Sequence, residues 1–193
     1  MKICVLNGSP KGKDSVTMQY VRFLELAFPA HTFVTEHVSQ RIALLESQEK
    51  EFSRVMESVA SADAVLFATP VYYMLVPAQM KRFIELVFLR NAGGAFTGKC
   101  ATSLTTSIHF FDHTANDYLH AIAEDLGMNW AGSFMAEMED LLIEKNQNDL
   151  ILFAEDFFAT VLCKPAVQRT FPPLAIDTPQ YRSGPIPLPF DTA

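Results

Sequence analysis

Side chains suited to binding an anion lie close together near the start of the chain. Hydroxyl groups and positive charges are interspersed with glycine at Ser9, Lys11, Lys13, Ser15 and Thr17. An apolar run precedes this segment and a helical pattern follows it, so the segment ends at a helix N-terminus, where unpaired N–H groups and the helix dipole favour an anion. Neither G-x-x-x-x-G-K-[ST] nor G-x-G-x-x-G is present, which argues against a triphosphate or a dinucleotide. The segment predicts a site for one phosphate monoester; a plain strand–helix turn with a serine cap is the alternative.

A second loop, residues 69–77, has an apolar and aromatic character. Pro70 and Pro77 bracket the run Val-Tyr-Tyr-Met-Leu-Val. Proline stiffens the backbone, and Tyr72 and Tyr73 offer a flat apolar wall to a planar ring. Packing of both tyrosines into the core is the alternative interpretation.

A third polar group follows a later apolar run. It consists of Thr105, Thr106, Ser107, His109 and Phe110. In open α/β sheets, ligands bind outside the carboxyl ends of the strands, and all three groups occupy such positions. A metal site would need His109 together with neighbours such as His113 and His120, and we predict none. We expect instead that His109 hydrogen-bonds a ligand and that Asp112 and His113 begin a helix.

Strand-like and helix-like patterns alternate along the chain. Apolar runs predict strands over residues 2–6, 31–38, 64–68, 99–106 and 130–135. Amphipathic periodicity predicts helices over residues 15–28, 49–60, 77–89, 114–126 and 149–162, with Gly127 as the C-cap of the fourth helix. This alternation predicts an α/β fold, a doubly wound five-stranded parallel sheet with helices on both faces.

The composition restricts the class of protein. With 193 residues, 49% hydrophobic and 19% charged, the chain cannot be disordered throughout. A net charge of −7 argues against nucleic acid or an anionic membrane as a partner. No apolar run is long enough to span a membrane. We interpret Cys4, Cys100 and Cys163 as buried thiols of a reducing compartment, which predicts a cytoplasmic location.

The last 30 residues differ from the rest. Residues 1–163 form one predicted domain, whereas residues 164–193 hold 7 of the 11 prolines and cannot form a helix or a central strand. Large apolar side chains are interspersed with these prolines. We therefore expect an extended arm that docks on this domain or on a partner, in preference to a solvated linker.

Two segments resemble one known family. Residues 7–17, NGSPKGKDSVT, resemble the FMN-phosphate loop of the flavodoxin-like NAD(P)H-dependent FMN reductases, in which a strand is followed by G-S-[PR], a basic residue and S/N-x-T. Residues 62–84 resemble the second signature of that family. The resemblance covers about residues 1–160 and implies the strand order 2-1-3-4-5. Related iron–sulfur flavoproteins carry cluster cysteines before the third strand; residues 41–52 contain none, which excludes a cluster.

The resemblance implies where FMN binds. The phosphate would be held by Ser9, Pro10, Lys11, Ser15, Val16 and Thr17. The isoalloxazine would be lined by Pro70, Val71, Tyr72, Tyr73 and Met74. The third FMN loop of the family would correspond to Thr105, Thr106, Ser107, His109 and Phe110, although this loop lacks the glycines that are common there. The Phe110–Phe111 pair would cover the flavin or meet a second subunit.

The implied activity is that of an FMN-dependent oxidoreductase. Hydride would pass from NAD(P)H through FMN to a quinone, a flavin or another small-molecule acceptor, with Tyr72, Tyr73, His109 and Phe110 shaping the substrate face. No side chain need act as acid or base, because the chemistry belongs to the flavin. A homodimer is expected. One alternative is a flavodoxin-type electron-transfer module that serves a partner through the C-terminal arm, and another is a flavin-free binding domain of the same fold.

Overall fold

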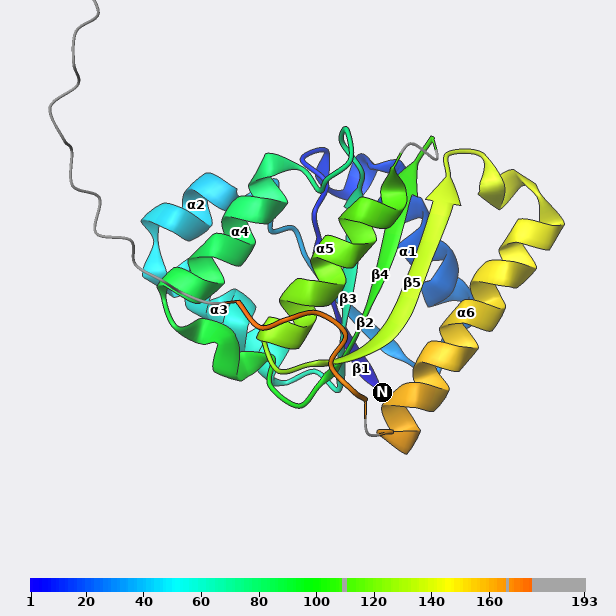
Figure 1. Cartoon of the computed structure of the whole chain (residues 1–193). Helices are drawn as coiled ribbons and strands as arrows, with labels where there is room; N and C mark the ends of the chain where they lie inside the picture. Colours follow the sequence, from blue (N-terminus) through cyan, green and yellow to red (C-terminus); the bar gives the residue numbers. More distant parts are fainter. Residues whose placement is uncertain (109–110, 166, 175–193) are drawn as a thin grey trace, which may run out of the picture.

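A five-stranded parallel sheet forms the centre of the fold (Figure 1). The computed structural model describes residues 1–108, 111–165 and 167–174. The strands are β1 (Lys2–Asn7), β2 (Thr32–Glu36), β3 (Ala64–Pro70), β4 (Cys100–Ser107) and β5 (Asn129–Glu137). The helices are α1 (Val16–Ala27), α2 (Ile42–Ser47), α3 (Glu49–Ala60), α4 (Ala78–Leu89), α5 (Asp112–Asp125) and α6 (Glu144–Cys163). The strand order β2-β1-β3-β4-β5 confirms the predicted doubly wound, flavodoxin-like architecture.

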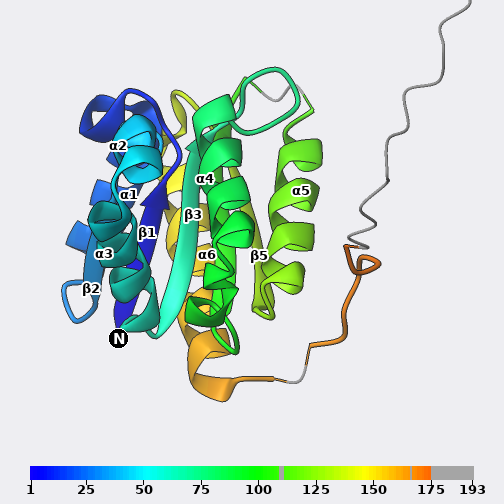
Figure 2. The ribbon, with the colours of Figure 1, turned by 90° about the vertical axis from the view of Figure 1, so that its left-hand side faces the viewer.

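Helices cover both faces of the sheet, and each face has its own core (Figures 1 and 2). Cys4 and Leu6 of β1 pack toward α2, α3, α4 and α5, whereas Ile3 and Val5 pack toward α1 and α6. Successive side chains of a strand point to opposite faces, so a strand covered on both sides is apolar at every position. This explains why β1 and β3 appear in the sequence as continuous apolar runs.

Two helices differ from the sequence prediction. α2 was not predicted, because its six residues are too few to display a helical period. α6 begins at Glu144 rather than at residue 149, because its first turn is polar and its buried face starts at Leu150. Cys163, at the end of α6, is exposed, so the expectation that all three thiols are buried is wrong for this one.

Glycine ends α5 as predicted. The Gly127 N–H donates to the carbonyl of Glu124 (3.1 Å), and the Met128 N–H donates to that of Ala123 (2.9 Å). Gly127 has φ +72°. These two bonds are the Schellman motif that satisfies the last carbonyls of a helix.

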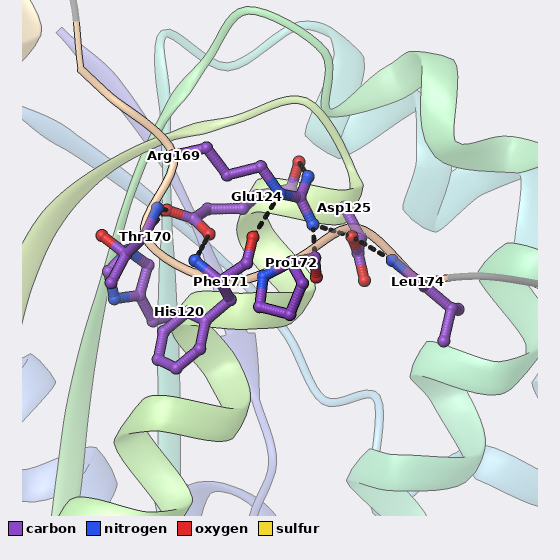
Figure 3. A network of polar contacts seen from close by, with 8 residues as sticks. All are labelled: His120, Glu124, Asp125, Arg169, Thr170, Phe171, Pro172 and Leu174. Atoms are coloured by element: carbon purple, nitrogen blue, oxygen red, sulfur yellow. Dashed lines mark hydrogen bonds and ion pairs between the residues drawn. The ribbon is translucent and has the colours of Figure 1, made fainter.

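The described part of the C-terminal arm, residues 164–165 and 167–174, is held at the end of α5 (Figure 3). The Glu124 carboxylate accepts the N–H groups of Thr170 (2.7 Å) and Phe171 (2.9 Å). Arg169 donates to the Glu124 carbonyl (3.1 Å) and pairs with Asp125. A carboxylate that accepts two N–H bonds in a buried position holds the arm in one register.

Ring contacts accompany these bonds. The Phe171 ring meets His120 edge-on at 5.0 Å, and His120 stacks on Trp130 at 4.9 Å. His120 Nε2 lies 3.0 Å from the Glu124 carboxylate. Leu174 donates its N–H to Asp125 (3.1 Å). The arm residues after 174 lie outside the described residues.

We expect Glu124→Gln to release the arm without unfolding the domain. Glutamine keeps one acceptor oxygen and loses the charge, so one N–H of the arm loses its partner at a cost of about 1–3 kcal/mol. Hydrogen exchange at Thr170 and Phe171 should then accelerate, while the amides of β3 stay protected. Glu155→Gln, on an exposed position of α6, is the control. Unchanged hydrogen exchange at Thr170 in E124Q would show that the Glu124 carboxylate does not hold the arm.

Acidification should have the same effect in the unmodified chain. Burial acts to raise the pKa of Glu124, but the N–H groups of Phe171 and Thr170 and the charges of His120 and Arg169 outweigh it, so the pKa is below its ordinary value of 4.5. Because the pKa of Glu124 is lower in the folded chain than in the unfolded chain, the ionised carboxylate stabilises the folded state. This stabilisation is present above pH 4.5 and is lost as the pH falls through the folded-state pKa.

Candidate functional site

A pocket of about 230 Å³ opens at the carboxyl edge of the sheet, at the ends of β1, β3 and β4. It is lined by Ser9, Lys11, Ser15, Val16, Thr17, Pro70, Val71, Tyr72, Thr106, Ser107, Ile108 and Met138. The three loops that the sequence singled out therefore meet in one place. β1 and β3 are neighbours in the sheet, and the crossovers that leave them turn to opposite faces; such switch points are where open α/β sheets bind ligands.

The first loop is shaped by bonds within itself. The Asn7 side chain accepts the Ser9 N–H (2.9 Å), and the Ser9 hydroxyl accepts the Lys11 N–H (3.3 Å). The Gly12 N–H then donates to the Ser9 carbonyl (3.1 Å). Gly12 has φ +61°, and a Cβ there would lie 2.4 Å from the Gln40 side chain. Glycine adopts this left-handed conformation without the strain that other residues incur, so it favours the turn that follows Lys11.

The start of α1 supplies hydrogen-bond donors. Ser15 is its N-cap, and its hydroxyl accepts the Met18 N–H (3.3 Å). The first N–H groups of a helix have no partner within the helix, and Val16 and Thr17, which line the pocket, occupy that first turn. Together with the Lys11 ammonium group, this is a donor set with net positive character, suited to a phosphate. Asp14, the nearby acidic residue, is exposed and is not among the lining residues.

The second loop presents a tyrosine to the pocket through a tight, strained turn. The Tyr72 N–H donates to the Leu75 carbonyl (2.7 Å). The two residues between them, Tyr73 and Met74, have φ +47° and +77°. Turns of this kind favour glycine or asparagine at such positions, and strained backbone of this sort clusters at functional sites. Tyr72 and Tyr73 are 49% and 82% exposed, so neither packs into the core.

The third loop joins the other two. The Thr106 hydroxyl bonds the Thr17 hydroxyl (2.6 Å), and the Thr106 carbonyl accepts the Val71 N–H (3.0 Å). Thr105 is buried on the other face of β4, where its hydroxyl accepts from Asn116 (3.0 Å). Thr106 thus holds the first and second loops at a fixed separation.

The predicted site residues divide into three groups. Those that line the pocket are Ser9, Lys11, Ser15, Val16, Thr17, Pro70, Val71, Tyr72, Thr106 and Ser107. Pro10, Tyr73, Met74 and Thr105 lie in the same loops but are not among the lining residues. His109 and Phe110 lie outside the described residues.

Two pocket residues escaped the sequence prediction. Ile108 lies between Ser107 and His109, inside a loop that was predicted, so its position alone was a sufficient signal. Met138 follows β5 in an acidic segment, between Glu137 and Glu139, and it is 60% exposed. Met138 could have been found from its position directly after the carboxyl end of β5. The acidic residues beside it indicated a solvated segment instead of a binding site.

Asp112 and His113 begin α5, as predicted. Over the described ranges, no three His, Cys, Asp or Glu side chains gather in a way that could hold a metal ion. A membrane-spanning helix is likewise not found in the part of the chain that the structure covers.

Comparison with known proteins assigns the chain to a family. A family model described as NADPH-dependent FMN reductase matches residues 1–138, which include all three loops. No match is found among curated proteins. An apo-form NADH:FMN oxidoreductase structure is 20% identical, with a TM-score of 0.67 over 84% of this chain and 89% of that one.

Two further solved structures share the fold. The flavoenzyme NAD(P)H:(acceptor) oxidoreductase of Paracoccus denitrificans is 18% identical, with a TM-score of 0.59 over 82% of this chain and 97% of that one. RosB, solved with 8-demethyl-8-formylriboflavin-5'-phosphate, is 12% identical, with a TM-score of 0.65 over 96% of each chain. The family match covers more than half of the chain and contains the whole first signature, and the sheet has the corresponding strand order. This chain belongs to the NADPH-dependent FMN reductase family.

Proposed function

We propose that this FMN-dependent oxidoreductase binds the FMN phosphate at the N-terminus of α1, places the isoalloxazine against Tyr72, and passes electrons from NAD(P)H to a small-molecule acceptor. The observation that carries the proposal is the shared pocket: the anion-binding donors of the first loop and the aromatic wall of the second loop line one cavity.

The residues present fit FMN. The phosphate needs hydrogen-bond donors and positive charge, which the Ser9, Ser15 and Thr17 hydroxyls, the first turn of α1 and Lys11 supply. Val16, Pro70, Val71, Ile108 and Met138 offer apolar surface to a ring system. We propose that these groups hold the two ends of the cofactor.

The role of the protein is to position the cofactor and to shield one side of its ring. When bound, FMN supplies the hydride chemistry, accepting two electrons from NAD(P)H and passing them to the acceptor. Tyr72 gives one flat wall for the ring.

The substrate face is a proposal of its own. Tyr72 lines the pocket and Tyr73 is the next residue of the same loop, and we propose that they shape the surface where the nicotinamide and the acceptor stack. His109 and Phe110 are proposed for the same face, although they lie outside the described residues. A quinone or a free flavin suits this aromatic rim as electron acceptor.

We further propose a homodimer and a cytoplasmic location. The pocket of about 230 Å³ is below the usual range of about 300–1,000 Å³ for ligand sites, so bound FMN would extend past its rim. Ile108 and Met138, which line the pocket, are 78% and 60% exposed, and we propose that a second subunit covers this apolar surface. A monomeric mass by light scattering at micromolar concentration would contradict the dimer. The buried thiols of Cys4 and Cys100 support a reducing compartment.

An absorption spectrum of the purified protein, before and after NADPH or NADH, tests the function. Flavin bands that bleach rapidly with either nicotinamide support the proposal. Bleaching with dithionite alone would favour the electron-transfer module that serves a partner through the C-terminal arm. A colourless protein that stays colourless after incubation with FMN and desalting would refute flavin binding altogether.

A further inference from the structure

The Asn7 carboxamide lies between the first loop and a histidine that no sequence motif indicated. Asn7 ends β1 and is fully buried. Its Oδ1 accepts the Ser9 N–H (2.9 Å), and its Nδ2 lies 2.8 Å from Nδ1 of His37. His37 directly follows β2, which pairs with β1. One buried amide therefore connects the phosphate loop to the end of the neighbouring strand.

The direction of both bonds is fixed by their chemistry. A backbone N–H can only donate, so the Asn7 atom that faces Ser9 must be the oxygen. The atom that faces His37 is then the NH₂ group, which also can only donate. His37 Nδ1 must therefore accept, so it carries no proton, and the proton of the neutral ring sits on Nε2.

We infer that His37 is a positioning residue for the FMN-phosphate loop, and that only its neutral form, protonated at Nε2, holds Asn7 in the orientation that fixes the Ser9 N–H. This inference rests on the proposed function, because it assumes that the loop receives the FMN phosphate. A proton on Nδ1 would place two donors face to face; Asn7 would then lose its partner or turn its oxygen toward His37 and release Ser9.

Other contacts show that this segment supports the first loop. The Ser39 N–H donates to the Asn7 carbonyl (3.3 Å). The Gln40 side chain lies so close to Gly12 that a Cβ on the glycine would meet its Oε1 at 2.4 Å. The chain after β2 thus contacts the first loop at both ends, and His37 is the titratable member of this support.

The surroundings favour the neutral ring. Burial lowers the pKa of His37 below its ordinary value of 6.5; the nearby Glu36 acts to raise it, while Arg41 and Lys13 act to lower it further. A lowered pKa means that the ordered loop is fully supported above pH 6.5 and loses that support as the pH falls through the folded value. FMN affinity should follow the same course, and bound FMN should in turn make His37 harder to protonate.

The phosphate itself titrates near pH 6, so a fall in affinity with acid would occur without His37, and a matched variant is needed to separate the two effects. His37→Asn serves this purpose, since its amide oxygen can accept from Asn7 at about the position of Nδ1 and does not titrate. His37→Leu removes the acceptor at every pH. The test is the dissociation constant of FMN, measured by fluorescence quenching from pH 8 down to the lowest pH at which circular dichroism shows the chain still folded.

We expect H37N to bind FMN about as tightly as the unmodified chain at pH 7.5, and H37L to bind about tenfold more weakly, the value of one buried hydrogen bond. As the pH falls from 7.5 through the folded-state pKa of His37, the unmodified chain should lose up to about tenfold more affinity than H37N does. Parallel pH profiles for these two proteins would overturn the inference, as would full affinity in H37L. Circular dichroism establishes that the variants fold.

A second readout needs no cofactor. Nitrogen-15 NMR of the histidine rings in the apo protein at pH 7.5 should show His37 with an unprotonated Nδ1 and a protonated Nε2. The opposite tautomer would overturn the inference even if FMN binds. Failure of the unmodified chain to bind FMN at pH 7.5 would instead refute the proposed function, and this inference with it, whatever the tautomer.

Discussion

The combined substitution Ser15→Asp and Thr17→Asp should abolish FMN retention. Both hydroxyls line the pocket at the first turn of α1. Two carboxylates there would replace hydrogen-bond donors by negative charges facing a dianionic phosphate. Each lost hydrogen bond to a charged group is worth about 1.5–3 kcal/mol, so the two together predict a dissociation constant raised at least about 100-fold, before any repulsion is added. Retained FMN after desalting, read from the flavin absorbance, measures the outcome.

Two further variants separate binding from folding. Gln19→Asp with Asn148→Asp adds the same charge at exposed positions and should keep FMN. Thr17 is buried and bonded to Thr106, so its replacement by a carboxylate also strains the fold. Ser15→Asp combined with Lys11→Ala spares that contact and should still raise the dissociation constant at least tenfold. Undiminished FMN content in this folded variant would show that the phosphate lies elsewhere.

The fold was predictable where burial determines the pattern of apolar residues along the sequence. β1 and β3 are buried on both faces, and their unbroken apolar runs are the direct consequence. The order of the strands came from the family resemblance, because no periodicity in a single chain reports which strands are neighbours. α2 has a single buried position, Leu45, and one buried residue defines no period. The first turn of α6 likewise contributes no buried residue, because the buried face of this helix starts only at Leu150. That turn therefore carries no apolar signal in the sequence.

The site was predictable where residues lie next to one another in the chain. Ser9, Lys11 and Ser15 are local to one loop, so their meeting at a helix N-terminus follows from the sequence pattern alone. Thr105 and Thr106 show the limit of such reasoning: neighbours in a strand face opposite sides, and only the structure decides that Thr106 joins Thr17. His37 was beyond reach, because its role depends on the pairing of β1 with β2 and on the direction of one side-chain amide.

Gly8 gives the second large effect, because it lies where the first and second loops touch. Its N–H donates to the Ala68 carbonyl (2.8 Å). A Cβ on Gly8 would lie 2.5 Å from Oγ1 and 2.6 Å from Cβ of Thr69. Thr69 is fully buried and its Cβ is fixed by the strand, so the added methyl group cannot be accommodated by a rotamer change. To relieve this clash, the chain at Gly8 must move away from β3. That movement breaks the hydrogen bond to Ala68 and separates Ser9 from Pro70, which both line the pocket.

We expect Gly8→Ala to lower the free energy of unfolding by about 1–3 kcal/mol or more and to weaken FMN binding at least tenfold. Chemical denaturation and FMN titration measure the two effects. Gly94→Ala is the matched control, because a Cβ at Gly94 meets nothing within 4 Å. Thr69→Gly removes both clashing atoms, so the double variant G8A/T69G should recover FMN affinity relative to G8A. That recovery is the coupling expected for two residues in direct contact. Additive losses in the double variant would show that the methyl group acts through the conformation of the first loop alone, and not through its approach to β3.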